Sequence, residues 1–349
     1  MSYRLLLVGG GATNGGDTGD GHIPITSEAV PFLLLALQFG LQPTLNKAFI
    51  ANGTSSSVLI IVTECIKIAL SIVAIWITTT PVDRERIVES LSVRDSAVRA
   101  GLPAFLYSIQ NWLILLGSRH ISPLSVSLLN QTKTLSAAFF TWWLLGKKQS
   151  AAQMVALVGL FVGAALIISA ERKEARLSKD AENLTSWKGF LSVALASLIS
   201  GVSSAASERA LSKPLGTKIP RFASSLLFSI ELAIFGIFTL VSSALFGLNP
   251  DLTVFSDPFR NWSMKTLIPI LSNASGGILV GIVTQRAGGV KKGVSLILGI
   301  CFATFVEAIL GQKALTTTHA IAVTVVAFSM WLYFNYPYAV PSKTTTKRE

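Results

Sequence analysis

The sequence has few charged residues. Asp, Glu, Lys and Arg make up 13% of its 349 residues, whereas hydrophobic residues make up 51%. Soluble domains usually carry about 25% charged residues, so this composition excludes an ordinary soluble domain and predicts an integral membrane protein. Acidic residues are fewer than basic ones, with 18 Asp and Glu against 29 Lys and Arg. The positive excess fits Lys- and Arg-rich cytoplasmic loops, an interpretation that we prefer to nucleic-acid binding.

Cysteine and histidine are scarce as well. Cys65 and Cys301 lie inside apolar runs, and the chain has three histidines. No CxxC or HxxxH spacing is present, and no Ser–His–Asp set or pair of carboxylates on one membrane face can be assembled. We therefore expect no metal site, no cofactor and no catalytic residue. The first apolar run, Leu5 to Val8, is shorter than the about 7–15 residues of a signal peptide, so none is expected.

What the sequence does have is long apolar segments along its whole length. A helix needs about 20 such residues to span the hydrocarbon core of a bilayer. The loops between segments are short, so consecutive helices should pack antiparallel, and we predict an all-α integral membrane protein with ten transmembrane helices. The predicted spans are 29–50, 56–80, 100–118, 121–145, 149–170, 187–207, 222–248, 266–285, 293–312 and 315–337.

Two stretches of the chain resemble each other. LLGKKQSAAQMVALVGLFVGAALII at 144–168 is similar to ILGQKALTTTHAIAVTVVAFSMWLY at 309–333. Five helices per half would give the halves opposite orientation, and such an inverted repeat is a transporter architecture; the alternative is ordinary helix capping by Leu-Gly-x-Lys. The predicted organisation is a cytoplasmic tail (1–28), a five-helix half (29–170), a polar luminal loop (171–186), a second five-helix half (187–340) and a cytoplasmic tail (341–349).

The distribution of basic residues predicts the orientation. With both termini in the cytoplasm, the basic loops RALSKPLGTKIPR and QRAGGVKKG and the Lys147/Lys148 turn are cytoplasmic, as the positive-inside rule requires. The loop sequons at Asn52, Asn183 and Asn261 then all fall on the opposite side. The predicted topology is therefore multi-pass with both termini cytoplasmic.

One lysine stands near the middle of the fourth predicted span. Lys133 follows the amides of Asn130 and Gln131, and a charge at that depth costs about 2.5–3.5 kcal/mol on insertion scales. Two interpretations stay open. Lys133 pairs with Glu64, Glu231 or Glu307, or its ammonium faces a central cavity and awaits an anion.

Other polar residues inside the predicted spans bear on these two interpretations of Lys133. Lys292 opens the ninth span, where free backbone N–H groups already favour phosphate. Lys133 and Lys292 on opposite halves would suit a ligand with phosphates in its middle. Glu64 and Lys67 are three residues apart on one helix face and predict an ion pair that is structural or gates the passage. Tyr107, Gln110 and Asn111 share a face of the third span.

Several motifs resemble those of the Golgi and ER nucleotide-sugar transporters, within the drug/metabolite transporter superfamily. The motifs are TECIK, LYSIQNWLILLGSRHISPLSVSLLNQTKTLSAAFFTWWLLGKKQS, ISGVSSAASERAL and VKKGVSLILGICFATFVEAILG. They are similar to the branch that carries UDP-galactose, UDP-N-acetylglucosamine and CMP-sialic acid. Carried over, the nucleotide-contacting positions of the family fall on Tyr107, Asn111, Lys133, Ser200, Gly201, Lys292 and Ser295.

The resemblance implies an antiporter in the Golgi or ER membrane. A nucleotide-sugar, in first place a UDP-sugar, would enter the lumen in exchange for the nucleoside monophosphate, with Lys133 and Lys292 facing the phosphates. Asn130 replaces a tyrosine of the branch, so base and sugar stay open. The alternatives are CMP-sialic-acid transport, another phosphorylated metabolite, and, last, a membrane-embedded transferase. A homodimer is left open, and the bilayer is the other partner expected.

Overall fold

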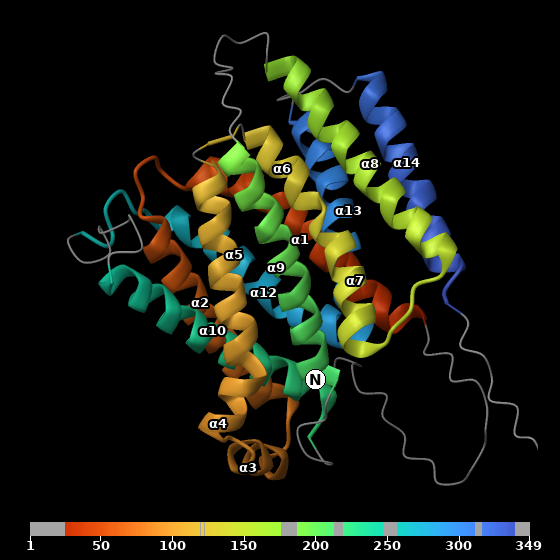
Figure 1. The fold of residues 1–349 in the computed structure, drawn as a ribbon. Helices are drawn as coiled ribbons and strands as arrows, with labels where there is room; N and C mark the ends of the chain where they lie inside the picture. Colours follow the sequence, from red (N-terminus) through yellow and green to blue (C-terminus); the bar gives the residue numbers. More distant parts are fainter. Residues whose placement is uncertain are drawn as a thin grey trace, which may run out of the picture.

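The computed structural model describes residues 25–118, 120–121, 123–175, 187–212, 219–246, 257–310 and 316–338. These residues form helices, and no β-strand occurs among them (Figure 1). The α-helices are α1 (Ile25–Phe49), α2 (Ser56–Thr78), α3 (Pro81–Glu89), α4 (Val93–Ser96), α5 (Leu102–Ser118), α6 (Pro123–Gln131), α7 (Lys133–Leu145), α8 (Ala151–Ala175), α9 (Trp187–Ser212), α10 (Arg221–Leu245), α12 (Leu267–Ala287), α13 (Gly289–Ile309) and α14 (Thr317–Asn335). A π-helical segment, η1 (Ala97–Gly101), joins α4 to α5, and a 3₁₀ turn, η2 (Met264–Thr266), precedes α12.

Eight helices of the described part are long and apolar enough to cross a membrane, which confirms an all-helical membrane protein. They span Ser56–Thr78, Val93–Ser118, Ala151–Ala170, Trp187–Ser212, Arg221–Leu245, Met264–Ala287, Gly289–Ile309 and Thr317–Asn335. Helix α1 and the pair α6 and α7 are not in this set. Ten spans in two inverted repeats therefore stay a prediction.

The single helix predicted over 121–145 is wrong. The chain forms two helices there, α6 and α7, which meet at Thr132. The Thr132 N–H bonds to the Leu129 carbonyl, three residues back rather than four, and its hydroxyl donates to the same oxygen at 2.6 Å. This tighter turn ends α6. As a result Lys133 is the first residue of α7 instead of lying inside a continuous helix.

Two helices, α1 and α8, extend beyond the predicted boundaries of the first five-helix half. The first helix begins at Ile25, so residues 25–28 belong to α1 and not to the tail. Helix α8 continues to Ala175, into the loop predicted over 171–186. The rest of that loop with Asn183, the first 24 residues and the tail 341–349 lie outside the described residues.

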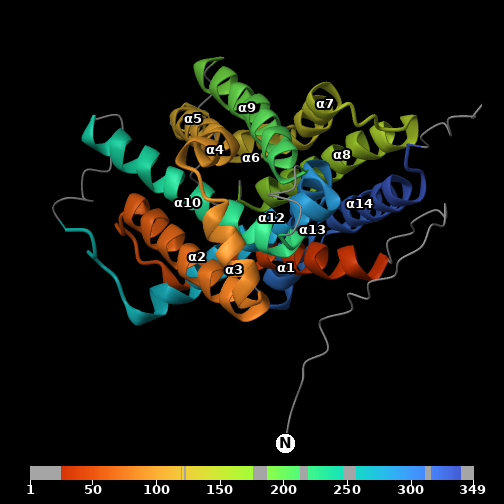
Figure 2. The ribbon, with the colours of Figure 1, turned by 90° about the horizontal axis from the view of Figure 1, so that it is seen from below.

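The long helices pack as one bundle around α12 and α13. Helices α8 and α14 lie side by side at one edge, and α2 lies against α10 at the opposite edge (Figures 1 and 2). Helix α1 packs on α12 and α13, while α9 packs on α5 and α7. The largest apolar core lies between α8, α13 and α14, where Leu160, Ile297 and Val326 are almost fully buried. This core fixes α13, and thereby Lys292, relative to the other helices.

Short helices and basic turns mark one end of the bundle. Helices α3 and α4 and the turn between α7 and α8 lie at the lower end in Figure 1. Helix α3 starts with a capping box between Thr80 and Asp83, and its Ile87 packs on Ala223 and Leu227 of α10. The turn from α7 to α8 carries Lys147 and Lys148. We call this end the basic end.

Candidate functional site

Lys133 of α7 and Lys292 of α13 lie next to a contact between these two helices. The two helices touch at the neighbouring residues, because a Cβ atom on Gly293 would lie 2.7 Å from the Thr134 hydroxyl. The positive charge of Lys292 acts on the Lys133 ammonium. Lys292 is also held by α5, since its Nζ donates a hydrogen bond to the Tyr107 hydroxyl at 3.2 Å and lies 5.7 Å from the centre of that ring. Two positively charged residues from distant parts of the sequence are thus close enough for their charges to interact.

Neither lysine is neutralised by a carboxylate in the described part of the chain. The ion pairs found there are Lys67–Glu64, Arg86–Asp83, Arg99–Glu231 and Lys147–Glu208. An ammonium group inside a helix bundle is costly without a counter-charge. The arrangement therefore favours the second interpretation of Lys133, in which the ammonium awaits an anionic ligand.

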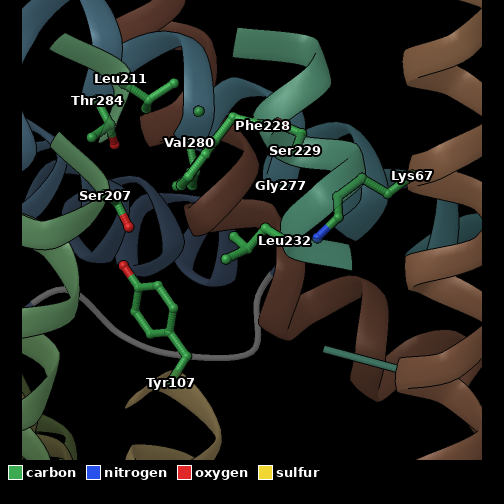
Figure 3. A pocket seen from close by; sticks show the side chains of 11 residues that line it. Lys67, Tyr107, Ser207, Leu211, Phe228, Ser229, Leu232, Gly277, Val280 and Thr284 are labelled. Atoms are coloured by element: carbon green, nitrogen blue, oxygen red, sulfur yellow. The ribbon is translucent and has the colours of Figure 1, made fainter. Parts of the chain in front are cut away.

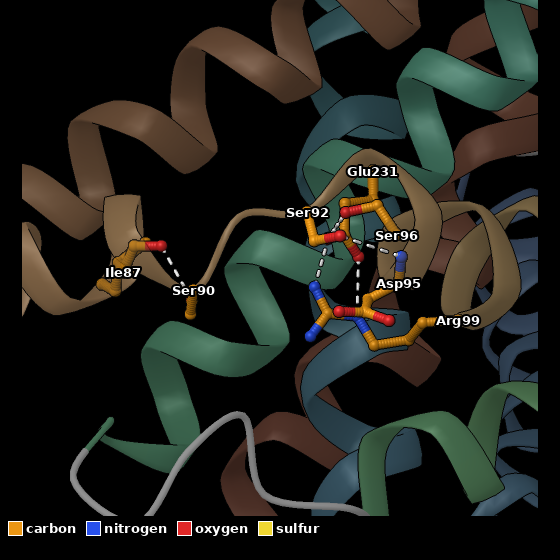
Figure 4. Close-up of polar contacts among 7 residues, drawn as sticks. All are labelled: Ile87, Ser90, Ser92, Asp95, Ser96, Arg99 and Glu231. Atoms are coloured by element: carbon orange, nitrogen blue, oxygen red, sulfur yellow. Dashed lines mark hydrogen bonds and ion pairs between the residues drawn. The ribbon is translucent and has the colours of Figure 1, made fainter.

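The carboxylates considered as partners for Lys133 lie elsewhere. Glu64 pairs with Lys67 on its own helix, as predicted. Glu231 of α10 binds Arg99 of η1, whose Nε donates to Oε2 at 2.9 Å, and Ser96 donates to Oε1 at 2.7 Å (Figure 4). Glu307 lies 15 residues beyond Lys292 on α13, about 22 Å along the helix. Arg99 is not among the residues predicted from the sequence, because it falls just outside the predicted third span.

Several of the polar residues predicted to lie near Lys133 have side-chain oxygens that accept no hydrogen bond. Asn130 and Gln131 end α6, directly before the break, and the side-chain oxygens of both are buried without a hydrogen-bond partner. The Gln131 Nε2 donates only to the Ser127 carbonyl, at 3.4 Å. On α5 the Gln110 Oε1 is likewise buried and unpartnered, whereas Asn111 is exposed. Such unsatisfied amide oxygens are hydrogen-bond acceptors for a polar ligand.

The remaining residues predicted to contact the ligand lie where helices pack against each other. Gly201 of α9 faces the backbone of α7, where a Cβ atom would come within 2.6 Å of the Ser136 carbonyl carbon. Ser200 beside it is buried. Ser295 is fully buried on α13, and its hydroxyl donates to the Lys291 carbonyl of the preceding turn at 3.3 Å. These residues set the distances between helices around the lysine pair, because small side chains allow close approach.

Gly201→Ala is expected to destabilise the protein by about 1–3 kcal/mol, because the new methyl group must push α9 away from the α7 backbone. Gly236→Ala is the matched control: it is also in a helix, but no atom lies within 4 Å of the position that its new methyl group would take. The control should be neutral or more stable by up to about 1 kcal/mol. Thermal unfolding of both purified variants tests the difference, and equal melting temperatures would contradict it.

A small cavity lies next to the Tyr107 side chain. Its volume is about 60 Å³, and it is lined by α2, α5, α9, α10 and α12. The Tyr107 and Ser207 hydroxyl groups point toward one another there, and the Lys67 side chain enters from α2 (Figure 3). Lys67 is buried and packs against Gly277 of α12, while its ammonium holds Glu64. The ion pair that the sequence predicts therefore lies at the edge of this central cavity.

The central cavity is too small to enclose an organic ligand. Pockets that enclose organic ligands usually measure about 300–1,000 Å³, and 60 Å³ accommodates only a few water molecules. Lys67 and Tyr107 of this lining were predicted from the sequence, whereas Ser207, Ser229 and Thr284 were not. Isolated hydroxyl residues in apolar helices carry no sequence signal that separates cavity lining from helix packing.

The profile of one protein family, nucleotide-sugar transporters, matches residues 34–334 and thus most of the chain. The chain belongs to the nucleotide-sugar transporter family. It is therefore a membrane transporter and not an enzyme. A UDP-N-acetylglucosamine transporter of Arabidopsis thaliana, ROCK1, is 30% identical over 310 residues, which cover 88% of this chain and 91% of the relative.

More distant family members agree with this assignment. The UDP-N-acetylglucosamine/UDP-N-acetylgalactosamine transporter nstp-4 of Caenorhabditis elegans is 28% identical and covers 73% of this transporter and 74% of the relative. The UDP-N-acetylglucosamine transporter of Rattus norvegicus is 25% identical, over 72% and 76% of the two chains. A solved crystal structure is similar in fold, with a TM-score of 0.64 at 13% identity over 90% of this chain and 99% of that one.

Proposed function

We propose that this transporter carries a UDP-sugar into the Golgi or ER lumen in exchange for the nucleoside monophosphate, with Lys133 and Lys292 binding the phosphate of either ligand. The observation that carries the proposal is a pair of lysines on the packed helices α7 and α13, neither of which has an ion-pair partner among the described residues. The names of the relatives, which transport UDP-N-acetylglucosamine, support a UDP-sugar as the substrate.

The same two charges explain exchange rather than one-way transport. A phosphate between Lys133 and Lys292 replaces their mutual repulsion by two charge-assisted hydrogen bonds. Without an anion, the carrier would have to pass through its closed conformation with two like charges facing each other away from water, where their repulsion is strongest. The empty carrier thus reorients slowly, and the loaded carrier reorients fast with either the nucleotide-sugar or the monophosphate.

The helix contacts support an inverted repeat and alternating access. If α1, α2, α5, α6–α7 and α8 are matched in order with α9, α10, α12, α13 and α14, the contacts correspond across the two sets. Contacts of α1 with α12 and α13 correspond to those of α9 with α5 and α7, and α2 with α12 corresponds to α10 with α5. The pairs α2–α10 and α8–α14 correspond to themselves. Ten spans with this internal symmetry suit rocking of one half against the other.

The orientation follows from the charge at the basic end. Lys147, Lys148 and the first turn of α13 with Lys291 and Lys292 lie toward this end, and the positive-inside rule supports a cytoplasmic position for it. At the other end, Asn52 and Asn261 are exposed, and the Asn261 side chain donates to the Asn52 carbonyl at 3.0 Å. The nucleotide-sugar would accordingly enter from the basic end and leave at the end with the sequons.

A thermal-stability screen of the purified transporter tests the ligand class. Among UMP, CMP, GMP, AMP and their sugar conjugates, UMP and a UDP-sugar should stabilise the protein, by about 2.7 kcal/mol at 100 times the dissociation constant. The same ligands should have no effect on Lys133→Ala. Absence of a shift with every nucleotide would contradict the proposal and leave the lysine pair without its assigned ligand.

A second candidate is transport of CMP-sialic acid or of another small phosphorylated metabolite. The observation in its favour is Asn130, three residues before Lys133, which replaces a tyrosine of the related branch and has a buried side-chain oxygen with no partner. A different base or sugar group would satisfy that oxygen. Stabilisation by CMP alone, or by a non-nucleotide phosphate in place of nucleotides, would select this alternative.

A further inference from the structure

A second and larger cavity opens at the basic end, separate from the central one. Its volume is about 210 Å³, and residues of α7, α8, α9, α13 and α14 line it, together with the turn from α7 to α8. Charged residues of the lining include Lys147, Lys148, Lys291 and Glu208. Three ammonium groups against one carboxylate make this a positively charged recess.

The inner wall of the recess is the N-terminus of α13, and a carboxylate already occupies it. The Glu208 Oε2 accepts a hydrogen bond from the Gly289 N–H at 2.7 Å, and its Oε1 accepts one from the Lys147 ammonium at 2.6 Å. Gly288 makes this approach possible: it has a φ of +88°, and a Cβ atom there would lie 3.1 Å from Glu208 Oε1. Glu208 is 3% exposed. The helix terminus thus binds an oxyanion, and Lys292 lies within one turn of it.

A buried hydroxyl group provides an independent sign of a missing ligand. Thr141 of α7 lines the recess and is 2% exposed, and its hydroxyl has no hydrogen-bond partner. Leaving such a group unsatisfied is unfavourable, so native structures usually supply a partner. Lys148 at the same cavity is exposed and takes part in none of the four ion pairs of the described residues. A phosphate oxygen would satisfy both groups.

We propose that this recess is an outer phosphate site, which binds the phosphates of the incoming nucleotide-sugar before they reach Lys133 and Lys292. The assignment rests on the proposed function. A cavity of 210 Å³ is smaller than the about 300–1,000 Å³ of pockets that enclose a whole organic ligand, so it suits the diphosphate and not the complete molecule. The incoming phosphate competes with Glu208 for the first turn of α13, and displacement of the carboxylate opens the path inward.

Uptake kinetics in proteoliposomes test the site. Lys148→Gln and Thr141→Val should each raise KM for the UDP-sugar about fivefold and leave kcat unchanged, because the interaction is made before the transport step. Lys188→Gln is the control, since Lys188 is an exposed lysine in the first turn of α9, at the opposite end of the bundle. A KM for Lys148→Gln equal to that of the control would overturn the assignment.

A binding measurement separates this proposal from the proposed function. The full chain with Lys133→Ala and Lys292→Ala lacks both lysines of the inner phosphate site. Inorganic pyrophosphate should still bind to it, as measured by calorimetry. Binding should disappear when Lys148→Gln and Thr141→Val are added. This result needs no UDP-sugar transport, so it stands even if the transported substrate is a different one. Pyrophosphate binding that is absent from the inner-site variant, or unaffected by the added changes, would overturn the outer site.

The same phosphate chemistry is found in lipid headgroups, and liposome composition distinguishes the two sources. The uptake series is repeated in phosphatidylcholine with and without a phosphatidylinositol phosphate. The KM effect of Lys148→Gln should be the same in both membranes. An effect that appears only with the phosphoinositide would assign the recess to a lipid headgroup and overturn its role in substrate entry.

Discussion

Lys133→Ala and Lys292→Ala are each expected to reduce UDP-sugar uptake by about a hundredfold or more. Each variant removes one of the two cations at the contact between α7 and α13, so the phosphate loses a charge-assisted contact. Uptake of a radiolabelled UDP-sugar into proteoliposomes preloaded with UMP measures the effect. Lys188→Ala, an exposed lysine away from the pair, should retain normal uptake.

The stability of the ligand-free Lys133→Ala variant is a second measurement, and the direction of its change distinguishes the two interpretations of Lys133. If Lys133 served in a buried ion pair, its removal would leave a carboxylate unpaired and lower the melting temperature. Because Lys133 is close enough to Lys292 to feel its like charge and takes part in none of the ion pairs described, Lys133→Ala should instead raise the free energy of unfolding, by about 1–3 kcal/mol. A destabilised variant with normal uptake would contradict the assigned role.

Glu231→Ala is expected to cause a large loss of stability, about 3–5 kcal/mol. The variant leaves the Arg99 guanidinium, which is 15% exposed, without its counter-charge, and it also removes the acceptor of the Ser96 hydroxyl (Figure 4). The pair joins η1 to α10, so its loss also frees a π-helical segment from the bundle. Thermal unfolding in detergent measures the effect.

Two further variants make the ion-pair prediction specific. Arg86→Ala breaks the more exposed pair with Asp83, in which the arginine is 38% exposed, and should cost less than about 1 kcal/mol. The double variant Arg99→Met with Glu231→Leu removes both buried charges and should recover much of the loss, because apolar residues of similar size often replace a buried pair without penalty. A single-variant loss as small as that of Arg86→Ala would contradict a structural role for the Arg99–Glu231 pair.

Sequence patterns predicted the membrane class and the polar residues of interest, but not how those residues are paired. Glu231 was one of three carboxylates that the sequence offered to Lys133, and the structure assigns it to Arg99, 132 residues away. Glu208, which caps α13 and binds Lys147, lies inside the motif ISGVSSAASERAL but was not singled out as a site residue. Whether two such residues meet depends on the rotation and depth of each helix in the bundle, and the sequence of either helix alone leaves both undetermined.

By itself the sequence determined that this protein is a helical membrane transporter with lysines at unusual depth, because hydropathy and charge act on each segment separately. The tertiary structure alone decided that Lys133 starts a new helix after the break at Thr132 and that this helix packs on α13 beside Lys292. It also decided that Gly201 lies against the α7 backbone and that the central cavity measures about 60 Å³. These properties depend on which helices touch, and contacts between residues far apart in the chain exist only once the whole bundle has packed.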